Sequence, residues 1–266
     1  MPLRPSLPAH RGLDLARTLA LWAYFTIGYV VFFFPSYLGA YLSADDRQAA
    51  FQKLNHRFFK IFFHFLEWLI PWARFRIGPE VRAIRGAVIV CNHRSYLDPI
   101  FLISLFERHK TIVKAVFFRI PIFRWGLRHA GYIPASARGD LASRMIEEVE
   151  SLGAFLAAGG NLFVFPEGTR GVQNEPGRLE KGAFRLARRW GVPLEVLWLE
   201  NTEKLFPPGR FLFDTRKPVE IRSQVLDRAA TDTTGVVIHV VGGEEENVEA
   251  RGGLEARQRQ QERGEE

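Results

Sequence analysis

The sequence contains a single cysteine, Cys91, so an intrachain disulfide cannot form. A reducing compartment is therefore permitted, and Cys91, within the apolar run of residues 87–91, is expected to be a small buried side chain. The 7 histidines are scattered without the spacing of metal ligands, so we expect no metal and no bound cofactor. A Gly-x-Ser-x-Gly motif is also absent from the sequence, which argues against a hydrolase with a serine nucleophile.

Acidic residues are fewer than basic residues. The chain has 36 Lys and Arg against 29 Asp and Glu, a formal net charge of +7 that suits nucleic acid or an anionic membrane surface. The 23 Phe residues are concentrated toward the N-terminal half, where they accompany tryptophans and basic residues. Because aromatic side chains favour the lipid headgroup region, we expect membrane lipid rather than nucleic acid as the partner.

Charged residues are missing altogether from residues 18–44. A helix needs roughly 20 apolar residues to cross a bilayer, so this segment is long enough to span or deeply penetrate a membrane. It lacks a small-residue cleavage site, which argues against a removed signal peptide. A buried core helix is the alternative, and the length and aromatic content disfavour it.

Residues 48–72 are predicted to form an amphipathic helix that ends near Pro71. Its basic side chains recur on one face, so the helix would lie at the membrane interface or pack on the first segment. The arginines at positions 4, 11 and 17 favour a cytoplasmic N-terminus. A single crossing would place the rest of the chain on the far side of the membrane. We therefore expect a helical pair that enters the membrane and returns to the same side.

From residue 74 onward, short apolar runs alternate with helical patterns, which predicts an α/β domain with a helix-flanked, mainly parallel sheet. The expected organisation is an anchor of hydrophobic helices over residues 1–73, an α/β domain over 74–228 and a helical or disordered tail over 229–266. Strands are predicted at 76–78, 87–91, 111–116, 131–134, 161–165, 194–199 and 219–222, and helices at 99–108, 119–130, 141–158 and 182–190.

Residues 92–99 are the first candidate site, between a predicted strand and a predicted helix. Asp98 is expected to cap the helix, with Pro99 at its first position. The turn can also bring His93 back to Asp98, whose carboxylate would hold one ring nitrogen protonated and leave the other to accept a proton. His56 lies in the same Asn-His-Arg tripeptide, but Ile61 stands where a carboxylate is needed, so His56 is expected to belong to a polar helix face.

Two further loops carry groups that suit a phosphate. Residues 165–170 read Phe-Pro-Glu-Gly-Thr-Arg and offer backbone, hydroxyl and guanidinium donors after a predicted strand. Glu167 would orient Arg170 or another cation, or cap backbone amides. Arg138 follows another predicted strand, where a second phosphate ligand and a solvated loop arginine are equally compatible with the sequence.

These loops together resemble the glycerolipid acyltransferase family, which includes 1-acylglycerol-3-phosphate acyltransferases. Asn92, His93 and Asp98 match its Asn-His-x-x-x-x-Asp motif, and residues 165–170 match its phosphate-binding motif. Lys114, Pro121 and Gly126 fall in the family's Lys…Pro…Gly stretch, so the resemblance covers about residues 75–222.

The sequence departs from the family pattern at two places. Arg138 lies seven residues after Gly131 rather than six, which makes its phosphate role less secure than that of Arg170. The fourth motif, at residues 192–196, lacks its second proline. Because that region shapes the substrate cleft, the acceptor can differ from the commonest one.

The resemblance implies direct acyl transfer from acyl-CoA or acyl-carrier protein to 1-acylglycerol-3-phosphate, at the cytoplasmic face of a membrane such as the bacterial inner membrane. It implies that His93 is the base and Asp98 its partner, and that Gly168, Thr169, Arg170 and Arg138 hold the phosphate. Another lysophospholipid or a lyso-aminolipid is the alternative acceptor. The rival functions are a hydrolase that uses His93 and a non-catalytic lipid- or nucleic-acid-binding protein.

Overall fold

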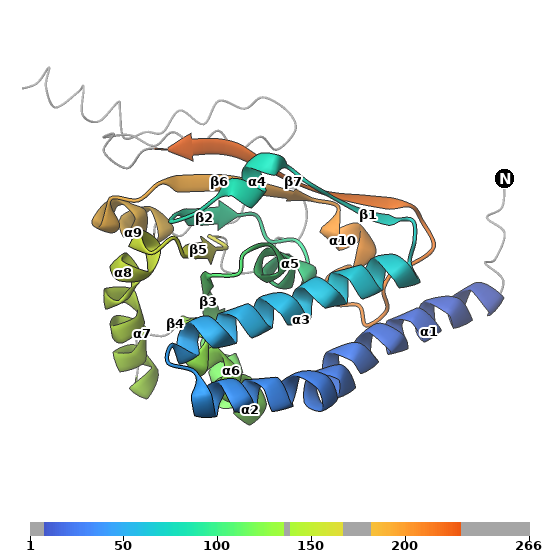
Figure 1. Cartoon of the computed structure of the whole chain (residues 1–266). Helices are drawn as coiled ribbons and strands as arrows, with labels where there is room; N and C mark the ends of the chain where they lie inside the picture. The colour runs from blue at the N-terminus through green and yellow to red at the C-terminus, as the bar shows by residue number, and fades with distance from the viewer. Residues whose placement is uncertain (1–7, 136–138, 167–181, 230–266) are drawn as a thin grey trace, which may run out of the picture. The chain divides into compact units, whose positions relative to one another are not determined.

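A computed structural model of the chain describes residues 8–135, 139–166 and 182–229. These residues form a seven-stranded sheet in the order β1-β7-β6-β2-β5-β3-β4 (Figure 1). Neighbouring strands run parallel, except that β7 is antiparallel to β6. The strands are β1 (Ala73–Ile77), β2 (Val88–Cys91), β3 (His109–Lys114), β4 (Ile133–Ala135), β5 (Asn161–Val164), β6 (Leu194–Glu200) and β7 (Val219–Ala229). The predicted mainly parallel α/β fold is confirmed.

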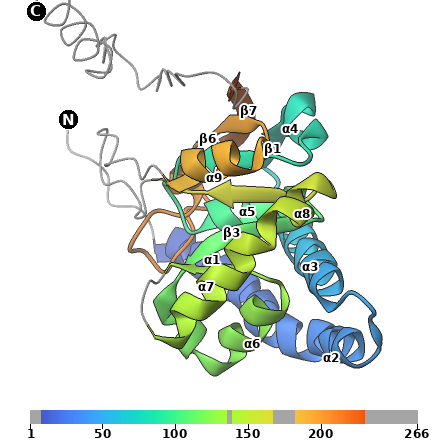
Figure 2. The same cartoon turned by 90° about the vertical axis from the view of Figure 1, so that its left-hand side faces the viewer.

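The central strands are apolar on both faces because helices cover both sides of the sheet. Val88 and Val90 of β2 belong to a core with α7 (Asp140–Glu150), α8 (Leu152–Ala157) and α9 (Gly182–Trp190). Ile89 and Cys91 point to the other core, with α3 (Arg47–Leu69) and α5 (Leu97–Leu105). Figure 2 shows α7, α8 and α9 together on one side of the sheet. Cys91 is buried, as expected.

Four further helical elements connect the strands. They are α4 (Pro79–Ala83), the 3-10 helix η2 (Ala115–Arg119), α6 (Pro121–His129) and α10 (Thr202–Leu205). The long helix predicted over residues 141–158 is divided at Ser151 into α7 and α8. Helix α9 has the predicted bounds, and every predicted strand is present. Most strand ends shift by up to three residues, while β7 continues to Ala229, seven residues beyond its predicted end.

The N-terminal helices are continuous from α1 (Pro8–Ala23) through the π-helical segment η1 (Tyr24–Phe33) to α2 (Phe34–Ser43). The wider turn is visible in the bond from the Phe34 N–H to the Tyr29 carbonyl, five residues back. Among the described residues, the helix Gly12–Ser43 is the one long and apolar enough to cross a membrane. Core helices and signal sequences can share that length and composition, which do not by themselves fix a position in a membrane.

Helix α3 returns antiparallel and packs between the first helix and α5 (Figure 1). Asp46 caps it by accepting the Ala49 N–H at 2.9 Å, and it ends just before Pro71. The predicted basic face is exposed and consists of Lys53, Arg57, Lys60 and His64. All described residues belong to one compact unit. The boundary expected at residue 73 therefore separates the proposed anchor from the proposed catalytic part, but the two parts are not packed separately.

His56 lies three residues after Lys53 and four before Lys60, and its ring also contacts α5. Its Nδ1 lies 3.0 Å from the carbonyl of Ile103, near the end of α5, and the ring is half-buried. Burial lowers the pKa of the imidazole, and the neutral ring donates to a carbonyl at the end of a neighbouring helix. His56 therefore fastens α3 to α5.

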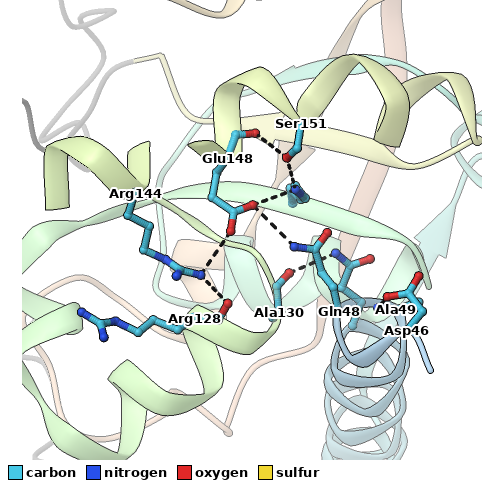
Figure 3. A network of polar contacts seen from close by, with 10 residues as sticks. Asp46, Gln48, Ala49, Arg128, Ala130, Arg144, Glu148 and Ser151 are labelled. Carbon is cyan, nitrogen blue, oxygen red and sulfur yellow. Dashed lines mark hydrogen bonds and ion pairs between the residues drawn. The ribbon is translucent and has the colours of Figure 1, made fainter. Parts of the chain in front are cut away.

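A buried polar network joins α3, α6 and α7 to the sheet (Figure 3). The Lys110 ammonium, on β3, donates to Glu148 of α7 at 2.8 Å, and its side chain is only 1% exposed. Arg144 donates to the same carboxylate at 3.1 Å and to the Arg128 carbonyl at the end of α6. The Gln48 amide reaches Glu148 at 3.5 Å. The elements β3, α3 and α7 thus meet at one carboxylate, and Arg144 links it to the end of α6.

Candidate functional site

The candidate site lies where two neighbouring parallel strands end. β2 and β5 pair in parallel, so the loops that follow them leave the sheet at the same edge. The chain then crosses from β2 toward β3 and from β5 toward β6, on opposite sides of the pair. Such a divergence of connections at the carboxyl edge is the usual place of a ligand site in an open α/β sheet.

His93 and Asp98 are in direct contact in the loop after β2. The Nδ1 atom of His93 lies 3.0 Å from Oδ2 of Asp98, whose side chain is fully buried. A carboxylate oxygen accepts, so Nδ1 carries the proton and Nε2 has a lone pair. Nε2 makes no hydrogen bond to the described residues, and the His93 side chain is 17% exposed. This geometry suits a proton acceptor held in one tautomer.

Asp98 is not the helix cap that we expected. Helix α5 begins at Leu97, so Asp98 lies inside its first turn, and its carboxylate points back into the preceding loop. Oδ2 accepts the N–H groups of Arg94 at 2.6 Å and Ser95 at 2.7 Å in addition to the His93 bond. The carboxylate therefore shapes the loop and orients the imidazole with the same oxygen, because the loop folds around it.

Two other side chains fix this loop, and the sequence did not assign them these roles. The Asn92 amide donates to the carbonyl of Leu199 and accepts its N–H, both at 2.8 Å, which continues the β2–β6 pairing by one residue. The Ser95 hydroxyl donates to the Phe206 carbonyl at 2.8 Å. The contact of Asn92 with Leu199 could not be predicted, because it depends on β2 lying beside β6. The sequence shows neither the order of the strands nor their register.

The phosphate-motif loop starts beside His93. Phe165, the residue directly after β5, places its ring 4.4 Å from the imidazole, measured between centroids. The sequence-predicted substrate-binding residues Glu167, Gly168, Thr169 and Arg170 follow immediately, but they lie outside the described residues, as does Arg138. The structure thus brings together His93, Asp98 and the start of the motif.

Lys114 ends β3 at the same edge and is exposed. Its cross-strand partner is Ala135, the last residue of β4. In the described part of the chain, no group of three or more His, Cys, Asp and Glu side chains is arranged to hold a metal ion.

Comparison with known proteins gives a consistent match. The model of the family described as Acyltransferase matches residues 74–199. The chloroplastic 1-acyl-sn-glycerol-3-phosphate acyltransferase of Brassica napus is 33% identical over 175 residues, which are 60% of this chain and 48% of that protein. A second chloroplastic protein of that name, from Arabidopsis thaliana, is 35% identical over 159 residues, which are 56% of this chain and 44% of that protein.

Residues 74–199 of the chain thus belong to an acyltransferase family. Among solved structures, the 1-acyl-sn-glycerophosphate acyltransferase of Thermotoga maritima aligns with a TM-score of 0.63 and 23% identity, covering 84% of this chain and 88% of that one. That likeness supports the acyltransferase fold. The chain spans about half the length of the chloroplastic relatives. The loop that carries His93 and Asp98 lies within the matched residues 74–199.

Proposed function

We propose that the protein is a membrane-associated O-acyltransferase that moves a fatty acyl group from a thioester onto the free hydroxyl of 1-acylglycerol-3-phosphate. The observation that carries the proposal is the His93–Asp98 contact, at the sheet edge where the Phe-Pro-Glu-Gly-Thr-Arg segment begins. The relatives named as 1-acyl-sn-glycerol-3-phosphate acyltransferases support the acceptor. Acyl-CoA and acyl-carrier protein are both suitable donors, since each carries the acyl group as a thioester.

The reaction needs one base and one leaving group. Nε2 of His93 takes the proton of the acceptor hydroxyl while its oxygen attacks the thioester carbonyl carbon. The tetrahedral intermediate then expels the thiolate as the C–S bond breaks, and the imidazolium returns the proton to sulfur. Asp98 keeps the proton on Nδ1 and stabilises the transient imidazolium, a combination worth roughly 10²–10⁴-fold in rate.

In this proposal, Arg170, Thr169 and the Gly168 amide hold the acceptor phosphate, with Glu167 orienting the arginine and Arg138 assisting. Each charged hydrogen bond would contribute about 1.5–3 kcal/mol. The N-terminal helices keep the protein at the bilayer, where the acyl chain of the acceptor remains. The long apolar helix Gly12–Ser43 supports this anchoring, and the basic residues before it favour a cytoplasmic active site.

The test is acyl transfer by the purified full chain in lipid. A panel of lysophosphatidic acid, other lysophospholipids and a lyso-aminolipid is offered with acyl-CoA and with acyl-carrier protein. Product lipid and released fatty acid are measured separately, which distinguishes transfer from hydrolysis. We expect phosphatidic acid as the main product from lysophosphatidic acid.

His93→Ala should reduce the rate by at least 10²-fold. His56→Gln is the matched control, because it changes the histidine of the second Asn-His-Arg tripeptide and still offers a donor to Ile103. It should retain transfer. A wild-type chain that esterifies none of the lyso-lipids would refute the proposal in favour of a binding protein. A His93→Ala variant with full activity would refute the role of His93 as the base.

A further inference from the structure

The segment between α10 and β7 presents an apolar tip to solvent. Phe211 is 57% exposed and Leu212 is 39% exposed. They follow a tight turn in which the Arg210 N–H donates to the Pro207 carbonyl at 3.3 Å. Gly209 allows this turn because its φ of 74° lies in the left-handed region. We refer to residues 207–212 as the Phe211 loop.

The Phe211 loop is fastened to helix α1. The Trp22 indole donates to the Phe211 carbonyl at 3.4 Å and stacks on the Phe211 ring with 5.8 Å between centroids. One turn earlier, the Thr18 hydroxyl accepts the Phe213 N–H at 3.1 Å. One turn earlier still, Asp14 accepts from Thr215. Three successive turns of α1 therefore hold the segment, so its exposed tip has a defined position.

Helix α1 extends the same apolar surface. Leu15 and Leu19 are exposed. Each of them directly follows one of the residues that bind the segment, Asp14 and Thr18. Together with Trp22 they form a row at spacings of four and three that reaches the stacked Phe211 ring. Exposed apolar side chains continue along the same helix beyond Trp22, at Ile27, Val30, Val31, Phe32, Phe34, Leu38 and Leu42.

Cations flank the tip of the loop. Arg210 precedes Phe211, while Arg216 and Lys217 follow it, and all three side chains are exposed. Arg216 also pairs with Asp14 at 2.9 Å. Aromatic and aliphatic side chains between cations match the interface of an anionic bilayer, where rings enter the headgroup region and Lys and Arg meet lipid phosphates.

We propose that the Phe211 loop inserts into an anionic phospholipid surface and forms a second membrane contact beside the N-terminal helices. This inference rests on the membrane association in the proposed function. Phe206, the residue before this loop, connects it to the candidate site. Its carbonyl accepts the Ser95 hydroxyl, and its ring stacks on Phe213 with 4.4 Å between the centroids. Insertion would thus hold the His93 loop near the bilayer surface that contains the acceptor.

A fluorophore at the loop tests the insertion directly. Leu212→Cys is labelled with an environment-sensitive NBD maleimide in the full chain, with the unsubstituted chain as the labelling blank because its single cysteine is buried. Ile146→Cys on α7, 51% exposed, is the matched control. The labelled chains are combined with phosphatidylglycerol–phosphatidylcholine vesicles with or without nitroxide-bearing acyl chains.

We expect the label at 212 to shift to shorter wavelength and to lose at least half of its emission to the nitroxide lipids, with little change at 146. Arg210→Gln combined with Lys217→Gln should remove the dependence of this quenching on the phosphatidylglycerol fraction, because each cation near an anionic surface is worth about fivefold in binding. Equal quenching at both positions would overturn the proposal. So would an unquenched label at 212, whether or not the chain floats with the vesicles.

Activity measurements separate this proposal from the catalytic one. Phe211→Ser combined with Leu212→Ser should slow transfer to acceptor in vesicles at least fivefold and leave transfer to acceptor in detergent micelles unchanged, whereas Ile146→Ser should affect neither. His93→Ala should abolish both reactions. Loss of both reactions in the loop variant would contradict a role confined to membrane contact, while quenching at 212 in a chain without transferase activity would refute only the proposed function.

Discussion

The imidazole of His93 lies against the ring of Phe165, with 4.4 Å between the centroids and 31° between the ring planes. His93 follows β2 and Phe165 follows β5, so this contact joins the two loops that carry the family's leading and phosphate-binding motifs. Asp98 holds the imidazole through Nδ1, and Phe165 supports one face of the ring. The His93 imidazole is therefore positioned by both loops.

Replacing Phe165 by leucine should lower kcat about tenfold, because ring–ring contacts contribute about 0.5–1.5 kcal/mol beyond burial. KM for the acceptor should change less than twofold, since the substitution acts through the imidazole. Phe165→Tyr keeps the ring and should retain most of the activity. A purely structural role would instead lower the thermal midpoint of unfolding in both variants without a selective effect on kcat.

Asp98→Asn should reduce the rate by roughly 10²–10⁴-fold, because a neutral amide cannot stabilise the imidazolium and permits the wrong tautomer. The amide oxygen can still accept the Arg94 and Ser95 N–H groups, so unfolding should change little. Asp98→Ala leaves the buried Ser95 N–H and the partly buried Arg94 N–H without this acceptor and should also lower the free energy of unfolding by about 2–4 kcal/mol. Equal stability of the two variants would contradict the structural half of this assignment.

Lys110→Met should destabilise the protein by about 3–5 kcal/mol, because it leaves the carboxylate of Glu148 without its buried partner. Combining it with Glu148→Leu should recover part of the loss. Lys53 and Glu107 form a matched exposed pair at 3.5 Å, and Lys53→Met should cost less than about 1 kcal/mol. Chemical unfolding of the variants in mild detergent measures these differences, and similar losses from the buried and exposed pairs would refute the distinction.

His109 should make stability depend on pH. Burial lowers the pKa of its imidazole to about 4, while Nδ1 donates to the Phe106 carbonyl at 2.8 Å and Nε2 accepts the Tyr132 hydroxyl at 2.6 Å. The unfolded chain, with a histidine pKa of about 6.5, binds more protons between these values, so stability falls as the pH falls from about 6.5 toward 4.

Between pH 7.5 and pH 5 this residue alone should remove about 2 kcal/mol from the free energy of unfolding. His109→Gln cannot titrate, so the difference between its free energies at the two pH values should be smaller by that amount. Measuring a difference within each protein corrects for any constant effect of the substitution. Identical pH dependence in both proteins would contradict a lowered His109 pKa.

The alternation of apolar runs and helical patterns predicted the sheet and the principal helices because each buried strand and each amphipathic helix leaves a local signature. Helices α4 and α10 escaped prediction because they have only five and four residues, too few to show a periodicity. The division of the 141–158 helix at Ser151 has only a weak local signal, since the one helix-disfavouring residue near it is Gly153, two residues further on.

The site was predictable to the extent that it is local. His93 and Asp98 are five residues apart, and their contact follows from one turn of chain. The contacts of Asn92 with Leu199 and of His93 with Phe165 depend on which strands are neighbours, information that the sequence holds only non-locally. The contact of His56 with Ile103 could not be predicted for the same reason, because Ile103 lies on another helix.

The attachment of α1 to the segment before β7 spans most of the chain. Thr18 and Phe213 are 195 positions apart, so α1 leaves the ribosome long before its partner is synthesised. During that interval the helix has an uncovered polar stripe and an apolar exterior, and a nearby bilayer can capture it first. The late arrival of the Phe213 segment would then lock an already oriented helix to the rest of the protein, and tilting of that helix would pull on Phe206 and, through it, on Ser95.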